Sequence, residues 1–301
     1  MKPVISVVVP IFNSEKTIIR CINALKKLNY KKFEIILVDD GSTDFTPSII
    51  KEIPDKRFKY FHQENAGPAA ARNLGAKQAK GDILAFMDSD CVPYSNWLNK
   101  IEKHFKDKEV IGVEGYVKTD KMSILTQSVR VDKGGRYLTA NIFYRKKEFL
   151  QEKFDEQFKF AFREDSDLGL RMAKRGKIIF EKTAKIYHIP REINLFSLMK
   201  RQKMYYFDPL FVKKHGNVTK RSFLDDPRTR SRLLLLSLIS LFLSFVNYSF
   251  VYIPIGFYIL GILYFIYIMI KEKKINIGNI VFLPISFLFS TATLYYLLKG
   301  S

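Results

Sequence analysis

The sequence predicts an α/β fold with a mixed, mainly parallel sheet, followed by C-terminal transmembrane helices. Two stretches, Ile5–Pro10 and Phe33–Val38, are predicted to be mainly apolar strands, and helical patterns separate the predicted strands. Such strands are typical of a parallel sheet that is covered on both faces. The membrane part is predicted by two stretches without Asp, Glu, Lys or Arg, from Leu233 to Ile270 and from Ile275 to Leu298.

Each element of the first domain is predicted from a local pattern. Pro10 is expected to end the first strand. Ser14 can cap the first helix, whose apolar residues recur at helical spacing. We expect strands at 5–10, 33–38, 58–61, 83–87, 110–117 and 137–144, and helices from 14 to 28 and at 46–51, 69–79, 96–105 and 163–174.

The most informative motif is Asp88-Ser89-Asp90, which follows the apolar run I-L-A-F-M. Residues i and i+2 of an extended chain point to the same side, so Asp88 and Asp90 form a pair of hard oxygen ligands. Magnesium and manganese prefer such ligands and often share them with a phosphate. Nucleotides bind at the carboxyl ends of strands in open α/β sheets. The motif therefore predicts a metal and nucleotide site.

Two motifs beside this one can contact a nucleotide. After the first strand, Pro10 is followed by Phe12, whose ring can stack on a base; the alternative is a plain turn. In A-A-A-R-N-L-G, the first turn of a helix can meet phosphate, and Arg72 adds a fork of donors. The alternative for Arg72 is a surface arginine on an alanine-rich helix.

Carboxylates also end the second strand, in V-D-D-G-S-T-D. Asp39 and Asp40 precede Gly41, and carboxylates beside a tight turn can accept hydrogen bonds from ribose hydroxyls or a base N–H. The alternative is that the polar residues of this turn, Ser42 and Asp44, cap the next helix.

Together these motifs resemble the family 2 glycosyltransferases, enzymes of the Rossmann-like GT-A fold. The matching segments are S-V-V-V-P-I-F-N, I-I-L-V-D-D-G-S-T-D, N-A-G-P-A-A-A-R-N-L-G-A and G-D-I-L-A-F-M-D-S-D, in this order within residues 6–90. The family's late signature follows as F-R-E-D-S-D-L-G-L-R at 162–171. The resemblance covers residues 1 to about 190.

The resemblance implies a role for each matching residue. A nucleotide-sugar site, a divalent metal (Mn²⁺ or Mg²⁺) and a carboxylate base are expected. His188 falls where many members place a metal or diphosphate contact, although a lone histidine is as often structural. The implied roles are nucleotide-sugar binding by Pro10, Phe12, Asp39, Asp40, Arg72, Asp88 and Asp90, metal binding by Asp90, Asp88 and His188, and general-base catalysis by Asp165 with Glu164 beside it.

The chemistry explains these parts. A nucleotide-diphosphate leaving group gathers negative charge, which a divalent ion held by Asp90 stabilises. An acceptor hydroxyl needs a base, and Asp165 begins a predicted helix whose dipole favours the ionised carboxylate. A single carboxylate base predicts inversion at the anomeric carbon. Asp167 and Arg171 are four residues apart and are expected to form only a helix-surface ion pair.

The expected activity is inverting transfer from a nucleotide-diphosphate sugar, with UDP-sugar favoured, to a hydroxyl of a lipid-linked or cell-surface glycan at the cytoplasmic membrane face. Long polymer synthesis is not expected, because Gln202 is followed by K-M-Y-Y and not by x-x-R-W. One alternative is a polyprenyl-phosphate sugar synthase, although D-A-D-L-Q-H-P-P is absent. A non-enzyme alternative is a nucleotide-sugar-binding membrane scaffold.

The formal net charge is +20, of which residues 196–232, directly before the apolar stretches, carry +7 (ten Lys or Arg and three Asp); this favours anionic membrane lipids as partners over nucleic acid. Basic residues flank the predicted helices on one side, which predicts a multi-pass cell-membrane protein with a cytoplasmic catalytic domain. The expected domains are a glycosyltransferase domain at 1–195, a basic amphipathic connector at 196–232, and a membrane domain at 233–298 with helices near 233–248, 250–270 and 277–298.

The chain contains two cysteines, Cys21 and Cys91. Two cysteines make no disulfide framework and fit a reducing compartment. Cys91 lies directly after Asp90, and we expect it to be a small buried hydrophobic residue.

Overall fold

The computed structural model describes residues 3–120, 126–193 and 206–216. Residues 3–120 and 126–191 form one compact unit, while the remaining described residues belong to a second unit. The second unit includes helix α8 (Asp208–His215), whose last turn carries Lys213, Lys214 and His215. The predicted motifs all lie in the first unit.

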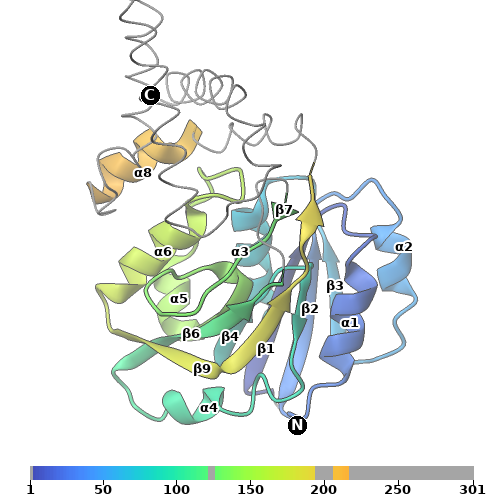
Figure 1. Ribbon diagram of the computed structural model, residues 1–301, viewed down its shortest axis with the longest axis horizontal. Helices are drawn as coiled ribbons and strands as arrows, with labels where there is room; N and C mark the ends of the chain where they lie inside the picture. The colour runs from blue at the N-terminus through green and yellow to red at the C-terminus, as the bar shows by residue number, and fades with distance from the viewer. Residues whose placement is uncertain (1–2, 121–125, 194–205, 217–301) are drawn as a thin grey trace, which may run out of the picture. The chain divides into compact units, whose positions relative to one another are not determined.

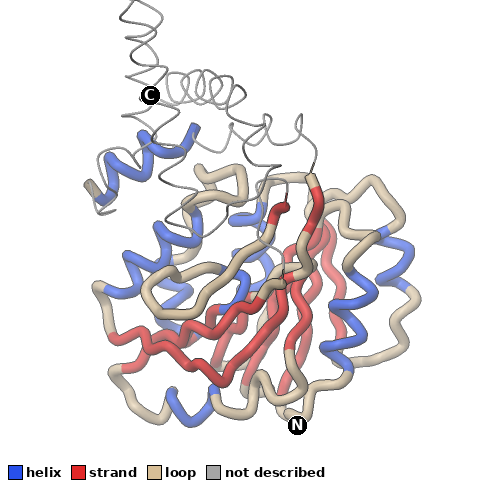
Figure 2. Tube along the Cα trace, viewed as in Figure 1, coloured by secondary structure: helices blue, strands red, loops and turns tan. Residues whose placement is uncertain are grey.

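A mixed eight-stranded sheet forms the centre of the first unit (Figure 2). Neighbouring strands are parallel from β3 to β4, and β8 and β5 run opposite to the other six. The prediction of a mixed, mainly parallel sheet is therefore confirmed. The strand order is β3 (Phe58–His62), β2 (Phe33–Asp39), β1 (Ile5–Ile11), β4 (Ile83–Phe86), β8 (Ile142–Arg145), β6 (Val110–Lys118), β9 (Lys177–His188) and β5 (Cys91–Pro93).

Helices cover both faces of this sheet (Figure 1). Alternate residues of β1 point to opposite faces, so Val7 packs in the core on the α1 side and Val8 in the core on the α3 side. Helix α3 approaches closely because it is rich in small residues: a Cβ on Gly75 would lie 2.4 Å from Val8 Cγ1. One face carries α1 (Ile18–Lys26) and α2 (Thr46–Lys51), and the other carries α3 (Pro68–Gln78), α5 (Lys146–Glu152) and α6 (Glu164–Ala173).

Two predicted element ends are wrong. Ser14 does not cap α1, which begins at Ile18 without a side-chain cap. Pro10 does not end β1, which continues to Ile11. The Val8 carbonyl accepts a hydrogen bond from Met87 on the β4 side, and the Pro10 nitrogen faces that same side two residues later. Because β4 has ended there, the missing N–H of proline breaks no ladder bond.

Several elements differ from the prediction further along the chain. The helix expected at 96–105 is reduced to α4 (Ile101–His104). The strand expected at 137–144 is a 3₁₀ turn, η1 (Thr139–Asn141), followed by β8. The structure adds β5, α5, β9 and the two-residue strands β7 (Thr126–Gln127) and β10 (Arg191–Glu192), which the sequence pattern does not predict.

The predicted multi-pass membrane location is contradicted. Within the described residues, no helix has both the length and the apolar character needed to cross a bilayer. A crossing helix needs about 20 apolar residues, whereas α3, the longest described helix, has 11 and packs on the sheet. The predicted membrane helices at 233–248, 250–270 and 277–298, and most of the connector at 196–232, lie outside the described residues.

Candidate active site

The loops after β1 and β2 are tied together at the carboxyl edge of the sheet. Asn13, which has a φ of 48°, donates its backbone N–H to Ser42 Oγ at 2.9 Å and accepts the Thr43 N–H on Oδ1 at 2.8 Å. The neighbouring Phe12 ring stays 50% exposed. The hydrogen bonds of Asn13 therefore fix the backbone beside Phe12 and leave its ring accessible to a ligand.

Asp39, at the end of β2, lies under this loop and is fully buried. Its Oδ1 accepts the Ser42 N–H at 2.9 Å, and its Oδ2 accepts the Tyr60 hydroxyl at 2.8 Å and lies 3.2 Å from His62 Nδ1. Burial alone would raise the pKa of Asp39, but these hydrogen bonds outweigh it and lower the pKa. Asp39 is an ionised brace for the turn.

Asp40 holds the turn before α3. Its Oδ1 accepts the Ala66 N–H at 2.8 Å and the Gln63 side-chain amide at 2.7 Å, and its Oδ2 accepts the Gly67 N–H at 2.9 Å. Gly67 has a φ of 94°, and a Cβ there would lie 2.6 Å from the Lys159 carbonyl oxygen. Only glycine fits that position, so the N-A-G motif fixes where α3 begins.

The acidic pair follows β4. The Asp88 and Asp90 side chains are 30% and 29% exposed, so both remain accessible. Between them, Ser89 Oγ lies 2.8 Å from Ser14 Oγ and joins this turn to the loop after β1.

His188 reaches the pair through strand pairing that the sequence pattern does not predict. Strand β5 pairs antiparallel with β9 and sets Cys91 opposite His188. His188 is 4% exposed, and its Nε2 lies 3.6 Å from Asp90 Oδ1. Its Nδ1 lies 3.2 Å from the Ile189 carbonyl oxygen, which can only accept. Nδ1 is thus directed at a backbone acceptor, and Nε2 is directed at the carboxylate of Asp90.

These groups fit a divalent cation. One ligand atom each from Asp88, Asp90, Cys91 and His188 lies within 4.8 Å of the others. Burial raises the pKa of Asp90, as does the charge of Asp88, against the opposing effects of His188 and Arg191. A bound cation would relieve the repulsion between the two carboxylates. Two carboxylates with an imidazole are ligands that Mn²⁺ or Mg²⁺ can use.

Arg72 lies behind the pair and not on the surface. It is 3% exposed, and its guanidinium donates to Asp88 Oδ1 at 2.9 Å and to Glu164 Oε1 at 3.0 Å. The fork that was expected to meet phosphate is thus directed at two carboxylates. Arg72 connects the turn after β4 with the start of α6.

The late signature places Glu164 and Asp165 at the start of α6. The preceding residue, Arg163, adopts a left-handed φ of 75°, which turns the chain sharply into the helix. Glu164 is 2% exposed and bound by Arg72, whereas Asp165 is partly exposed. Burial raises the pKa of both carboxyls, whereas the position at the start of a helix was expected to favour the ionised form. The charge of Asp165 raises the pKa of Glu164 further. The positive charge of Arg72 acts in the opposite direction on both carboxyls.

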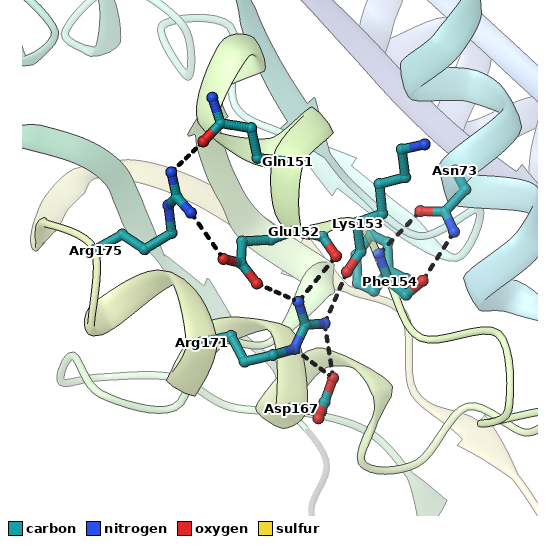
Figure 3. A network of polar contacts seen from close by, with 8 residues as sticks. All are labelled: Asn73, Gln151, Glu152, Lys153, Phe154, Asp167, Arg171 and Arg175. Atoms are coloured by element: carbon teal, nitrogen blue, oxygen red, sulfur yellow. Dashed lines mark hydrogen bonds and ion pairs between the residues drawn. The ribbon is translucent and has the colours of Figure 1, made fainter. Parts of the chain in front are cut away.

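A network of polar contacts braces the chain between α5 and α6 (Figure 3). Arg171 donates to Asp167 Oδ2 at 2.7 Å and also to the backbone carbonyls of Glu152 at 2.9 Å and Lys153 at 2.7 Å. Asp167 is fully buried. The expectation of a mere helix-surface ion pair is therefore wrong, because the pair fixes the end of α5.

Further contacts connect this network to Arg72 through Phe154. Asn73 holds the backbone of Phe154 at both its N–H (3.0 Å) and its carbonyl (2.9 Å). The Arg72 guanidinium lies 5.6 Å from the centre of the Phe154 ring, a cation–π distance. Sequence reasoning missed Asn73 and Phe154, and only the adjacency of Asn73 to Arg72 could have indicated a role.

Substitution of Arg171 by alanine should lower the free energy of unfolding by about 2–3 kcal/mol, because it removes several hydrogen bonds to charged or buried groups. The matched control is Arg175→Ala in the turn directly after α6; the Arg175 guanidinium donates to the side chains of Glu152 and Gln151, and its loss should cost less than about 1 kcal/mol. Urea unfolding of both variants measures the difference. An equal decrease in the free energy of unfolding in both variants would show that the hydrogen bonds from Arg171 to the backbone carbonyls of Glu152 and Lys153 are not what stabilises the fold.

Comparisons with known proteins agree with this geometry. A sequence profile described as Glycosyl transferase family 2 matches residues 6–168, more than half of the chain. An uncharacterised glycosyltransferase of Rickettsia felis is 38% identical over 146 residues, which cover 46% of this chain and 23% of that protein. Glycosyltransferase GlyG of Streptococcus pneumoniae is 40% identical over 118 residues, 38% of this chain and 39% of GlyG. The matched part is well under half of either relative.

Solved structures share the fold. S. aureus TarS 1-349 in complex with UDP-GlcNAc has a TM-score of 0.56 at 19% identity, covering 98% of this chain and 91% of that one. The mannosyltransferase PcManGT of Pyrobaculum calidifontis, in complex with GDP-Man and Mn²⁺, has a TM-score of 0.57 at 14% identity and covers 100% and 86%. At these identities the likeness concerns the GT-A-like α/β fold alone. With the family profile, it shows that this chain belongs to glycosyltransferase family 2.

Proposed function

We propose that this protein transfers a sugar from a nucleotide-diphosphate donor, with UDP-sugar favoured, to a hydroxyl of a glycan, with inversion at the anomeric carbon. The observation that carries the proposal is the chain of contacts from Glu164 through Arg72 to Asp88. It joins the carboxylates at the start of α6 to the acidic pair after β4, so that a base and a metal-binding pair belong to one rigid site.

The donor half of the site is supported by the residues at the carboxyl edge of the sheet. The exposed Phe12 ring is suited to stack on the base, with Pro10, Asp39 and Asp40 fixing the turns around it. Asp88, Asp90 and His188 would hold Mn²⁺ or Mg²⁺, which stabilises the charge on the departing diphosphate when bound. Arg72 keeps the Asp88 carboxylate oriented from the buried side.

The acceptor half rests on Asp165. It is the accessible member of the pair, whereas Glu164 is enclosed and occupied by Arg72. A hydroxyl must lose its proton as it attacks, and a carboxylate within reach can accept it. A phosphate acceptor would need no base, so the Glu164-Asp165 pair favours a hydroxyl over a polyprenyl phosphate. An intact acidic pair and base likewise disfavour a non-catalytic scaffold.

Nucleotide binding tests the donor. UDP with Mn²⁺, at a concentration about 100 times its Kd, should stabilise the protein by about 2.7 kcal/mol, since ligands that bind only the native state add RT ln(1 + [L]/Kd). The measurement is the midpoint of thermal unfolding with UDP, UDP-GlcNAc, GDP or GDP-mannose, each with Mn²⁺ or EDTA. A larger shift with GDP would replace the UDP assignment, and no shift with any nucleotide would reject the donor class.

The pH dependence of transfer tests the base. Asp165 acts in its ionised form, and burial raises its pKa above the ordinary value of 3.8. The rate constant kcat/KM should therefore rise with pH along an acidic limb that lies above that value, and the limb should be absent in Asp165→Asn. A limb that is unchanged in the variant would assign it to another group.

A further inference from the structure

Cys91 shares the face of the sheet that carries the metal-binding groups. It is fully buried and lies opposite His188 in the pairing of β5 with β9. Directly opposed residues of an antiparallel pair place their Cβ atoms about 4.5–5.5 Å apart on one face. Its sulfur and the His188 imidazole therefore point into the same space as Asp90.

The separations between the ligand atoms match one small coordination shell. Cys91 Sγ lies 3.8 Å from Asp90 Oδ1, His188 Nε2 lies 3.6 Å from the same oxygen, and no two of the four ligand atoms are more than 4.8 Å apart. A tetrahedral Zn²⁺ site has bonds of about 2.0–2.3 Å, which put neighbouring ligand atoms roughly 3.3–3.8 Å apart. The separations of Cys91 Sγ and His188 Nε2 from Asp90 Oδ1 have the length of edges of such a tetrahedron.

His188 supplies an independent indication that the shell is built for a ligand. Its side chain is 5% exposed, its Nδ1 lies 3.2 Å from the Ile189 carbonyl oxygen, and its Nε2 lies 3.6 Å from Asp90 Oδ1. A buried imidazole held in this way is prepared to bind a metal ion.

The ligand set distinguishes hard ions from thiophilic ions. Mg²⁺ and Mn²⁺ prefer oxygen and leave a thiol uncoordinated, whereas Zn²⁺, Cd²⁺ and Co²⁺ also accept imidazole and thiolate. A hard ion on Asp88, Asp90 and His188 keeps positions open for a diphosphate. An ion that takes all four protein ligands is closed, as in structural zinc sites.

We propose that Cys91 is a fourth ligand for thiophilic divalent cations, which it holds in a closed tetrahedral site that excludes the nucleotide diphosphate. As the metal–sulfur bond forms, the thiol proton leaves to solvent, and no electron is transferred. The consequence for transfer rests on the proposed function, but the ligation itself does not.

Cobalt titration of the metal-stripped protein tests the ligation directly. The unaltered protein should develop a sulfur-to-cobalt charge-transfer band in the near ultraviolet together with intense visible bands of tetrahedral Co²⁺. Cys91→Ser should lose the charge-transfer band. The matched control is Cys21→Ser, because Cys21 is equally buried but lies in α1, outside the cluster, and this variant should keep the band.

Competition between Co²⁺ and Zn²⁺ measures how much Cys91 contributes to the affinity for Zn²⁺. The Zn²⁺ Kd of Cys91→Ser should rise by more than the roughly 10–100-fold that loss of a second-shell partner costs, so the preference for Zn²⁺ over Mn²⁺ should fall. Bound Co²⁺ without a charge-transfer band in the unaltered protein, or a band that survives in Cys91→Ser, would overturn the proposal.

Two further measurements distinguish a failure of the proposed Cys91 ligation from a failure of the proposed transfer activity. The ¹¹³Cd NMR shift of the unaltered protein should report one sulfur ligand, and this requires no variant to fold; a shift typical of oxygen and nitrogen ligands alone overturns the proposal. Zn²⁺ should also inhibit Mn²⁺-dependent transfer. If no nucleotide sugar is turned over, the proposed function fails, whereas the cobalt and cadmium spectra still decide whether Cys91 is a ligand.

Discussion

Replacement of Asp90 by asparagine should lower kcat of sugar transfer by about 10³-fold, because a bound metal contributes several kcal/mol of transition-state stabilisation and about 4 kcal/mol corresponds to that factor. Asparagine keeps the size and one carbonyl oxygen but removes the charge that holds the cation. The side chain is 29% exposed at a strand end, so the fold should persist. Transfer by the purified variant at saturating donor and Mn²⁺ measures the effect.

The matched control is Asp120→Asn, which removes an exposed carboxylate that pairs with Lys118 on the surface and should leave kcat within about twofold, as surface substitutions usually do. EDTA should abolish transfer by the unaltered protein, and Mn²⁺ should restore it. An enzyme that works equally well in excess EDTA would contradict the metal assignment, whatever Asp90→Asn does.

The fold was predictable where local patterns and tertiary contacts agree. The strands β1 and β2 are buried on both faces, so most of their residues are apolar, apart from the buried Ser6, Glu34 and Asp39. Strand β9 was missed because its pairing with β6 is irregular, with a register shift between Gly115 and Tyr116. Exposed and buried residues do not alternate over the first seven residues of β9 and do so only from Ala184 to His188, so a period of two marks only the end of the strand.

The site was predictable where the ligands are adjacent in sequence. Asp88 and Asp90 were predicted to lie on one side of an extended strand, but β4 ends at Phe86, and the Cys91 N–H donates to the Asp88 carbonyl at 3.1 Å, which closes a turn over this motif. The direction of Arg72 was not predictable, because its partner Glu164 is 92 residues away and reaches it only when tertiary folding brings the start of α6 to Arg72. The same holds for Cys91 opposite His188, since the register of β5 on β9 depends on the whole second half of the sheet.

The base assignment depends on a comparison within the Glu164-Asp165 pair. Glu164→Gln changes a carboxylate that is 2% exposed and bound to Arg72, so it should affect the position of Arg72 and the binding of the donor. Asp165→Asn changes the accessible carboxylate, whose Oδ1 accepts hydrogen bonds from the backbone N–H and the hydroxyl of the next residue, Ser166. The two variants therefore separate a positioning effect from the loss of a proton acceptor.

Asp165→Asn should lower kcat by roughly 10²–10⁴-fold, the usual contribution of a positioned general base, while donor affinity barely changes. Single-turnover transfer measures the chemical step, and UDP-sugar binding is measured separately. Glu164→Gln should instead weaken donor binding and retain the acidic limb of the pH profile. If Asp165→Asn stays within about threefold of the unaltered enzyme, far short of that range, Asp165 is not the base, and an acceptor that is already anionic, such as a polyprenyl phosphate, becomes the better assignment.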